Sequence, residues 1–371
     1  MTSRERVLAA MRREQPDRMP INIRGARVWE PDWVATRDRS YRPLIDVVLE
    51  HCDVIPHPPV GGLGLPLFTR AEEEITETLT VDAGDWTIHR TILHTPKGDL
   101  SQDYWESKLD YLPLTKSYFL KQPEDVARAL SVPYVPPPID LSEYFQTCER
   151  WPANLTMCSC PQASECVHDL LGSETFAYWW VEHRSSLFRL LEAFEERVLA
   201  AVEFILLAGA GPVFATNGSE QIAPPLHAPQ TYREFVLPHF RKLTRRIHER
   251  GGMLHVHCHN RVSALLEDFV EAGWDVTHPL EPPPMGDVDL ADAKRRVGKQ
   301  LCLEGNTQIG ELYAAPTERV IALVEEAIMT GRPGGGFILC PSASPHTPAL
   351  SHLAVSNYLA MIETGVKLRD Y

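Results

Sequence analysis

The 371-residue chain is long enough to bury a substantial core, and its 44% hydrophobic and 23% charged residues are ordinary for a folded, soluble protein. A formal net charge of −14 argues against nucleic acid or an anionic membrane as the main partner, because both bind basic surfaces. No apolar run is long enough to cross a bilayer, residues 1–18 lack the apolar core of a secretory signal, and the eight cysteines are scattered, which together predict a cytoplasmic protein with reduced thiols.

The N-terminal half begins with a predicted helix over residues 2–14 and a short predicted strand over 20–23, which is followed by Arg24 and Arg27. These arginines can hold a carboxylate or phosphate of a substrate, or they can be solvated at the surface. Residues 79–105 alternate polar and apolar side chains around the turn TPKGD, which predicts an antiparallel β-hairpin.

The C-terminal half alternates short apolar runs with amphipathic stretches, a pattern that predicts parallel strands separated by helices. The predicted strands are residues 212–216, 253–257, 275–280, 301–305 and 336–340. The predicted helices are residues 230–250, 261–272, 289–297, 316–330 and 349–366. No strand is followed by a glycine-rich nucleotide-binding motif, which favours a barrel over an open sheet. We therefore predict an α/β protein, a (β/α)₈ TIM barrel of one domain over residues 1–371, with the hairpin as an insertion.

Polar side chains lie at the ends of successive predicted strands, and these ends converge on the active-site face of such a barrel. The residues concerned are Asn217, His255, His257, His278, Glu304, Asn306 and Cys340.

The segment MLHVHCHNRV (253–262) holds three histidines and a cysteine within five positions. Side chains alternate along a strand, so His255 and His257 share a face and Cys258 is turned away, unless the strand ends before it. His259 is expected to take no part. Two histidines are half of a zinc site, and Cys340 is the best third ligand. The alternative to a metal site at the histidines is a single buried histidine with solvated neighbours. The alternative for Cys340 is a small side chain that only fills the core.

Three glutamates are candidates for a fourth ligand, namely Glu220, Glu281 and Glu304, with water or substrate as the alternative. Glu220 follows a predicted strand, where a carboxylate can bind metal, act as a general base or begin the next helix. Glu281, in the proline-rich loop LEPPP, is a second candidate acid or base.

With these residues identified, the sequence resembles the uroporphyrinogen decarboxylase-like superfamily over almost its whole length. The resemblance rests on RERVLAAMRREQPDRMPI, FVLPHFRKLTRRIHERGGMLHVHCHNRV, GWDVTHPLEPPPMGDVDLADAKRRVGKQLCLEGNTQ and GGGFILCPSASPHTP. It implies a (β/α)₈ barrel. One branch of the superfamily consists of decarboxylases that need no metal, and another consists of zinc-dependent methyltransferases that use methylcobamide.

The chain resembles the methyltransferase branch more closely. It reads NIRGARVWEPD where the decarboxylases have the arginine-rich signature M-R-Q-A-G-R-Y-L-P-E-Y. The methyltransferases bind zinc through H-x-C on one strand and a distant cysteine. His255 and Cys340 match this pattern, whereas the middle ligand is either His257 or Cys258.

The resemblance therefore implies a Zn²⁺-dependent methyltransferase that moves a methyl group between a corrinoid and a small thiol or a methoxylated or phenolic substrate. The methylcobamide would be free or carried by a partner corrinoid protein, because the chain has no D-x-H-x-x-G motif. The alternatives are a metal-free decarboxylase of a carboxylated substrate and a catalytically silent subunit of a methyltransferase complex. A homodimer is also compatible with the sequence. The expected roles are Glu220 and Glu281 in catalysis, Asn217 and Asn306 at the cofactor, and Arg24, Arg27 and His278 at the substrate.

Overall fold

The computed structural model describes residues 1–109 and 113–371, and the described chain divides into two compact units. The first unit comprises Met1–Pro59, Leu141–Cys160 and Ala210–Tyr371. The second comprises Val60–Asp140 and Pro161–Gly209. A single domain over residues 1–371 stays a prediction.

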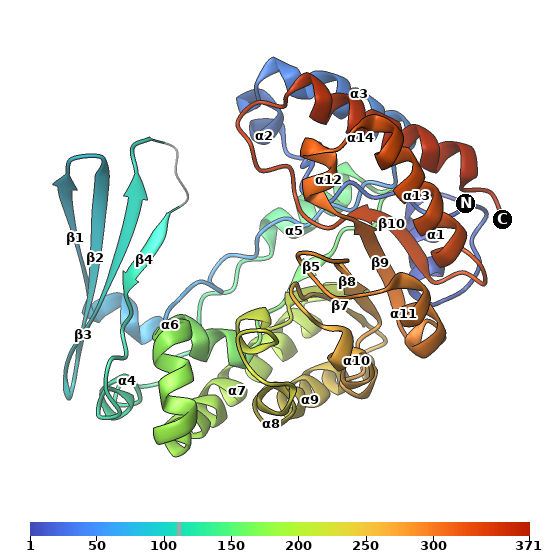
Figure 1. Ribbon diagram of the computed structural model, residues 1–371. Coiled ribbons are helices and arrows are strands. Elements are labelled where there is room, and N and C mark those ends of the chain that lie inside the picture. The colour runs from blue at the N-terminus through green and yellow to red at the C-terminus, as the bar shows by residue number, and fades with distance from the viewer. Residues whose placement is uncertain (110–112) are drawn as a thin grey trace. The chain divides into compact units, whose positions relative to one another are not determined.

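The first unit contains a parallel sheet of six strands in the order β10-β9-β8-β7-β6-β5 (Figure 1). All five strands predicted in the C-terminal half are present. The strand over 253–257 has the predicted ends, and the ends of the other four differ from the prediction by one or two residues. The strands are β5 (Cys158–Ser159), β6 (Val213–Asn217), β7 (Met253–His257), β8 (Val276–His278), β9 (Cys302–Thr307) and β10 (Phe337–Pro341). This α/β architecture is similar to a TIM barrel.

Two extended segments carry backbone hydrogen bonds to this sheet. Ile21 pairs in parallel with Leu339 of β10, and the Asn22 N–H donates to the Leu339 carbonyl at 2.9 Å. The Asp53 N–H donates to the Ile21 carbonyl at 2.7 Å. The Met157 N–H, just before β5, donates to the Pro56 carbonyl at 2.8 Å. Residues 20–23, predicted as a strand, therefore pair with the sheet through a single bridge.

Helices connect the strands of the first unit, as the repeated pattern predicts. The predicted helix 230–250 is two helices, because Pro238 has no N–H to continue the hydrogen-bond ladder across Val236. The helices are α1 (Ser3–Met11), α2 (Pro31–Thr36), α3 (Arg42–His51), α5 (Ser142–Arg150), α8 (Pro229–Phe235), α9 (Leu237–His248), α10 (Leu266–Glu271), α11 (Leu290–Val297), α12 (Ile309–Ala314), α13 (Thr317–Gly331) and α14 (His352–Leu368). Short 3₁₀ turns are η1 (Arg39–Tyr41), η3 (Glu220–Ile222) and η4 (Ser263–Leu265).

One buried apolar cluster in the first unit gathers side chains from five strands and from α1. Its members alternate with outward-facing residues along each strand, as the pleat requires. They include Val213 and Ala215 of β6, Met253 of β7, Val276 of β8, Cys302 of β9, Ile338 of β10, and Val7, Ala10 and Met11 of α1. The residues that continue this alternation toward the strand ends form the candidate site.

The second unit contains a four-stranded antiparallel sheet in the order β1-β2-β3-β4 (Figure 1), where the sequence predicted a two-stranded hairpin over 79–105. The TPKGD turn does connect two paired strands, β2 (Trp86–Thr95) and β3 (Gly98–Ser107). The prediction missed a second turn at Gly84, where φ is +72° and the Asp82 carboxylate accepts the Gly84 N–H. That turn joins β1 (Thr76–Ala83) to β2, and β4 (Leu114–Ser117) pairs with β3.

Helices of the second unit are α4 (Asp125–Ala129), α6 (Ala163–Glu182) and α7 (Arg184–Leu207), with the 3₁₀ turn η2 (Arg70–Ile75). The proline-rich segment 132–140 is extended, as its composition predicts. All eight cysteines are free thiols. Among residues 1–109 and 113–371, no helix is both long and apolar enough to cross a membrane.

A buried ion pair joins α1 to the segment that follows α3. The Arg6 guanidinium lies 2.6 Å from the Asp53 carboxylate, and both side chains are almost completely buried. Asp53 also accepts the Ile21 N–H at 3.3 Å, and Arg6 is held in addition by Asp17.

We predict that Asp53→Asn lowers the free energy of unfolding by about 2 to 3 kcal/mol, because it leaves a buried guanidinium with only one of its two carboxylates. Urea denaturation followed by circular dichroism measures this change. Asp46→Asn is the matched control, because its ion pair with Arg42 is solvent-exposed and contributes less than about 0.5 kcal/mol. Equal effects of the two substitutions would contradict the importance of the buried pair.

Candidate functional site

The candidate site lies on the face of the parallel sheet that carries the apolar cluster. Along β7, Met253 belongs to that cluster, so His255 and His257 project from the same face. By the same alternation, Cys302 is followed by Glu304 on β9, and Ile338 by Cys340 on β10. The parallel register therefore places His255, His257, Glu304 and Cys340 on one face of the sheet.

Glu304 is the most buried carboxylate of this site, with 1% of its side chain exposed. One carboxylate oxygen lies 2.5 Å from His255 Nε2, and the other accepts a hydrogen bond from Asn22 Nδ2 at 2.7 Å. Burial raises the pKa of Glu304, but the charge and hydrogen bond of His255 and the Arg24 charge outweigh it and hold this pKa below the ordinary value. Glu304 is therefore an anion inside the fold, and His255 Nδ1 is buried without a partner.

The Cys340 thiol is completely buried beside the Glu304 carboxylate and the backbone N–H of Arg24. Burial, and then the negative charge of Glu304, raise the pKa of Cys340 well above its ordinary value. The thiol is therefore protonated in the structure, and binding a metal would require it to release this proton.

His257 and His278 form a chain of hydrogen bonds that ends at a backbone carbonyl. Their Nδ1 atoms are 2.7 Å apart, and His278 Nε2 lies 3.0 Å from the Pro341 carbonyl oxygen. Burial, and then the positive charge of Arg24, lower the pKa of both rings well below the ordinary value, so both are neutral at pH 7.

This geometry fixes the position of each ring proton. A carbonyl only accepts, so His278 carries its proton on Nε2 and accepts at Nδ1. His257 must then donate from Nδ1, which leaves His257 Nε2 with a free lone pair. His257 thus offers an unprotonated nitrogen that can bind a metal or accept a proton.

Arg24 supplies the positive charge of the site. Its charge lowers the pKa values of His57, His257 and His278, and no carboxylate of the described chain lies within ion-pair distance of it. Burial, and then the Arg24 charge, lower the pKa of His57 to about 3, so this ring is neutral and exchanges a 2.9 Å hydrogen bond with Ser159. A cavity of about 170 Å³ is lined by Asn22, Arg24, Arg27, Trp29, His57 and Met157.

A second acid–base group lies next to His257. His259 Nδ1 is 3.0 Å from the buried Glu281 carboxylate, whose other oxygen accepts the Ser342 hydroxyl at 2.9 Å. Burial lowers the pKa of His259, but the Glu281 hydrogen bond and the charges of Glu220 and Glu281 raise it further than burial lowers it. The ring centroids of His257 and His259 are 4.5 Å apart, so His259 belongs to the site, although we expected from the sequence that it would take no part.

Cys258 lies on the opposite side of β7 from His257. Its thiol donates to the Gly218 carbonyl at 3.5 Å, and its backbone N–H continues the strand pairing by donating to the His278 carbonyl at 2.7 Å. A Cβ on Gly218 would lie 2.9 Å from the Cys258 sulfur and 3.1 Å from Trp274, so the thiol is enclosed there. The alternation thus continues through residue 258, and His257 rather than Cys258 faces His255.

The remaining predicted residues are less close to the histidines. The Glu220 carboxylate accepts the His259 N–H at 2.9 Å, which places it at the edge of the site. Asn217 is exposed at the end of β6, and Asn306 lines a different cavity. Arg27 is half exposed and pairs with Glu30 at 3.1 Å, although it also contributes to the cavity at Arg24.

Three residues of this site escaped the sequence prediction, namely Asn22, His57 and Ser159. Asn22 lies within the short segment 20–23, and His57 follows residues 53–56. Both segments make only a few backbone hydrogen bonds to their neighbours, so no long alternating run marks which of their side chains face the site. The signal that could have identified them is polarity next to a short apolar stretch, in PINI and DVIPH. Within the described ranges, no three or more His, Cys, Asp or Glu side chains are gathered closely enough to hold a metal ion.

Comparison with known proteins gives the family. The family model for uroporphyrinogen decarboxylase (URO-D) matches residues 168–358, more than half of the chain. The chain therefore belongs to the URO-D family, in agreement with the resemblance seen in the sequence.

Two relatives are uroporphyrinogen decarboxylases. The protein of Shewanella piezotolerans is 35% identical over 115 residues, which cover 29% of each chain. The protein of Thioalkalivibrio sulfidiphilus is 29% identical over 168 residues, which cover 42% of each chain. The matched region thus spans less than half of the length of these relatives.

A solved structure, described as a methyltransferase from Methanosarcina mazei, is similar over 98% of both chains with a TM-score of 0.62. Its sequence identity is 16%, so this similarity concerns the fold. Both branches of the sequence prediction, decarboxylase and methyltransferase, are thus represented among the similar proteins.

The hydrogen-bond chain at His257 leads to a spectroscopic prediction. We expect ¹⁵N spectra of histidine-labelled protein to show His257 protonated on Nδ1 and His278 on Nε2. Neither ring should titrate between about pH 6 and pH 8, because both pKa values are lowered below this range. His257→Gln assigns the His257 signal by its loss.

His278→Phe removes the acceptor of the His257 proton and should let His257 adopt the other tautomer. A His257 ring protonated on Nε2 in the unmodified protein would contradict the proposed arrangement.

Proposed function

We propose that this chain is a methyl-transfer enzyme of the URO-D family that binds a zinc ion through His255, His257 and Cys340 on a closed (β/α)₈ barrel. The observation that carries the proposal is the free lone pair of His257 Nε2 on the same face as His255 and Cys340, while Cys258 faces the other way.

Closure of the barrel is supported by the two extended segments beside the six-stranded sheet. Residues 20–23 bond to β10, residue 53 bonds to Ile21, and Pro56 accepts from the residue that precedes β5. In the proposed barrel these segments would be the first two strands, and eight strands would follow one another around a ring. Each polar strand-end residue then faces the same opening.

The chemistry of the donors fits zinc, since the proposed ligands offer two imidazoles and a thiol, with the Glu304 carboxylate beside them. His255 Nδ1 is buried without a partner, which is costly unless some group binds there. Since no three donors are gathered closely enough among the described residues, metal binding would require the side chains of His255 and Cys340 to turn from Glu304 toward a common point. Zinc held there would act as a Lewis acid toward a thiol or ether oxygen.

The other side chains have separate tasks in this proposal. Glu304 and Asn22 orient His255, and His278 fixes the proton of His257. His259, held by Glu281, can exchange a proton with the substrate at the edge of the site, with Glu220 beside it. Arg24 can bind an anionic group of the substrate.

We further propose that the methyl group comes from, or goes to, a methylcobamide that is free or carried by a corrinoid protein. The other partner of the reaction would be a small thiol or a methoxylated or phenolic compound. In support of this proposal, the cavity of about 170 Å³ at Arg24 has room for a small organic substrate.

Metal analysis of untagged protein tests the ligands. We expect close to one zinc per chain in the unmodified protein and a loss of at least about tenfold in zinc affinity in His257→Ala and Cys340→Ala, because three protein ligands are the usual minimum. Cys258→Ala is the matched control, since it removes a buried thiol of the same strand without touching the proposed ligands. It should keep its zinc.

Two outcomes would overturn the zinc proposal. One is a metal-free protein that stays folded by circular dichroism, and the other is an equal loss of zinc in Cys258→Ala. If zinc binds but no methyl group moves from methylcobalamin to thiol or phenolic acceptors, methyl transfer by this chain is rejected, and the silent-subunit alternative gains support.

A second candidate is a metal-free decarboxylase, which is favoured by Arg24 among three neutral histidines. A guanidinium without a carboxylate partner binds a carboxylate well. His259, whose pKa is raised by the Glu281 hydrogen bond and the charges of Glu220 and Glu281, can deliver a proton to the carbon that loses carbon dioxide. The names of the two relatives also support this candidate.

Benzoate binding tests whether Arg24 is a carboxylate site. We expect Arg24→Gln to weaken binding about tenfold, the loss of one charge-assisted bidentate contact. Arg27→Gln should change it less than about twofold, because Arg27 is exposed and paired with Glu30. Release of carbon dioxide from uroporphyrinogen by metal-free protein, abolished in Arg24→Gln, would decide for the decarboxylase. Benzoate binding that is insensitive to Arg24 would count against it.

A further inference from the structure

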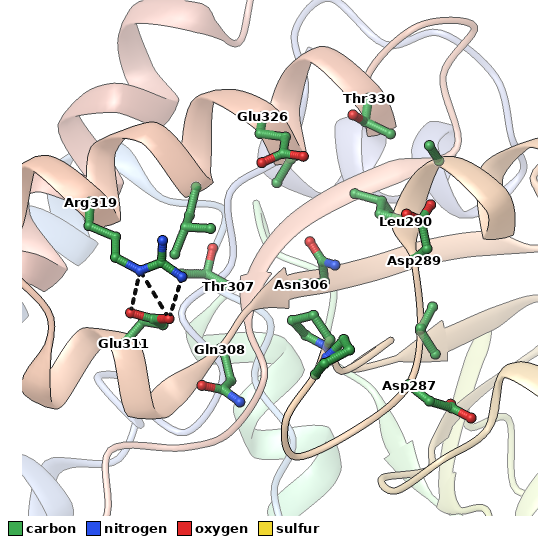
Figure 2. Close-up of a pocket in the computed structure, with 16 residues that line it drawn as sticks. Asp287, Asp289, Leu290, Asn306, Thr307, Gln308, Glu311, Arg319, Glu326 and Thr330 are labelled. Atoms are coloured by element: carbon green, nitrogen blue, oxygen red, sulfur yellow. Dashed lines mark hydrogen bonds and ion pairs between the residues drawn. The ribbon is translucent and has the colours of Figure 1, made fainter.

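A second cavity, of about 310 Å³, lies apart from the histidines in the first unit (Figure 2). It is bounded by the proline loop after β8, the end of β9 and one face of α13. The proposed reaction uses none of the side chains that line it.

The charge of this cavity is strongly negative. Figure 2 shows Glu326 of α13 and Asp289, the N-cap of α11, on the same side of the cavity, whereas Asp287 lies in the loop and directs its carboxylate away from them. The single guanidinium among the lining residues, Arg319, is held by both oxygens of Glu311 at 2.9 to 3.2 Å, so its charge is already neutralised. Asp289 uses one oxygen to accept a backbone N–H and keeps the other oxygen for a ligand.

Two buried polar atoms in the lining lack a partner among the described residues. Gln308 is 8% exposed and its Nε2 donor is unpaired, and Thr307 is 3% exposed with an unpaired hydroxyl. A buried amide without a hydrogen bond costs about 1 to 3 kcal/mol, so a ligand atom that accepts from Gln308 would be favoured.

The rest of the lining is apolar and comes from two directions. Pro282, Pro283 and Val288 line the cavity from the loop, Leu290 from α11 and Leu323 from α13. This part of the wall is suited to a hydrocarbon or aromatic body.

We propose that this cavity binds a small organic ammonium compound that has an apolar body and a hydrogen-bond acceptor. The ammonium group would lie between Glu326 and Asp289, and the acceptor would meet Gln308 Nε2. The same carboxylates exclude phosphate and carboxylate ligands, because a second anion here would meet several uncompensated negative charges. The proposal involves none of the proposed zinc ligands.

Calorimetric titration with tyramine at low ionic strength tests this site. Tyramine combines an ammonium group, an aromatic ring and a hydroxyl oxygen, whereas 4-ethylphenol lacks the charge and 4-hydroxyphenylacetate reverses it. We expect saturable binding of tyramine and at least about tenfold weaker binding of both analogues.

Glu326→Gln should weaken tyramine binding about fivefold, as expected for one partly exposed ion pair. Glu325→Gln is the matched control, because it removes an equal charge from the adjacent position of α13, outside the cavity lining, and should leave binding unchanged. His257→Ala should bind tyramine like the unmodified protein, which separates this site from the zinc proposal.

Absence of saturable tyramine binding, equal binding of the anionic analogue, or equal weakening by Glu325→Gln and Glu326→Gln would each overturn the proposal. Loss of tyramine binding in folded His257→Ala would assign the binding to the histidine site instead.

Discussion

The two-residue alternation of side chains along parallel strands is the constraint on which the site depends. Since Met253, Cys302 and Ile338 belong to the apolar cluster, the residues two positions further along each strand must emerge on the same face. That places His255, Glu304 and Cys340 together and turns Cys258 toward Gly218 and Trp274. A shift of one residue in the register of β7 would bury Val256 in place of His255 and dismantle the site.

Burial and the charges of neighbouring side chains determine the protonation state of each group in the site. Glu304 stays ionised inside the fold because His255, Asn22 and the Arg24 charge compensate for its lost hydration. The same Arg24 charge, together with burial, keeps His57, His257 and His278 neutral. The site thus combines buried carboxylates, the Arg24 guanidinium and three uncharged imidazoles, a set that suits ligand binding and proton transfer alike.

Much of the fold follows from local pattern, and the departures have local causes. The apolar runs of the C-terminal half correspond to β6 to β10, because strands covered on both faces need continuous apolar sequence. The predicted helix 230–250 is divided by Pro238, and the predicted hairpin gains β1 and β4 through the turn at Gly84 and further pairing. Asn22 and His57 were missed because the extended segments that carry them are too short to leave a periodic signal in the sequence.

The sequence by itself determined the class of fold, the family and the candidates at the strand ends, because these depend on hydrophobic periodicity and on short motifs along the chain. It left open whether His257 or Cys258 stands beside His255, and it gave His259 no part. Tertiary structure decided both points, because they depend on contacts with distant residues. Gly218 and Trp274 leave room for the thiol on one side, while His278, Pro341 and Glu281 bind the imidazoles on the other. The face of a strand on which a side chain lies can be predicted from the sequence. Which ring nitrogen of each histidine carries the proton depends instead on hydrogen-bond partners that are 20 or more positions away in the chain.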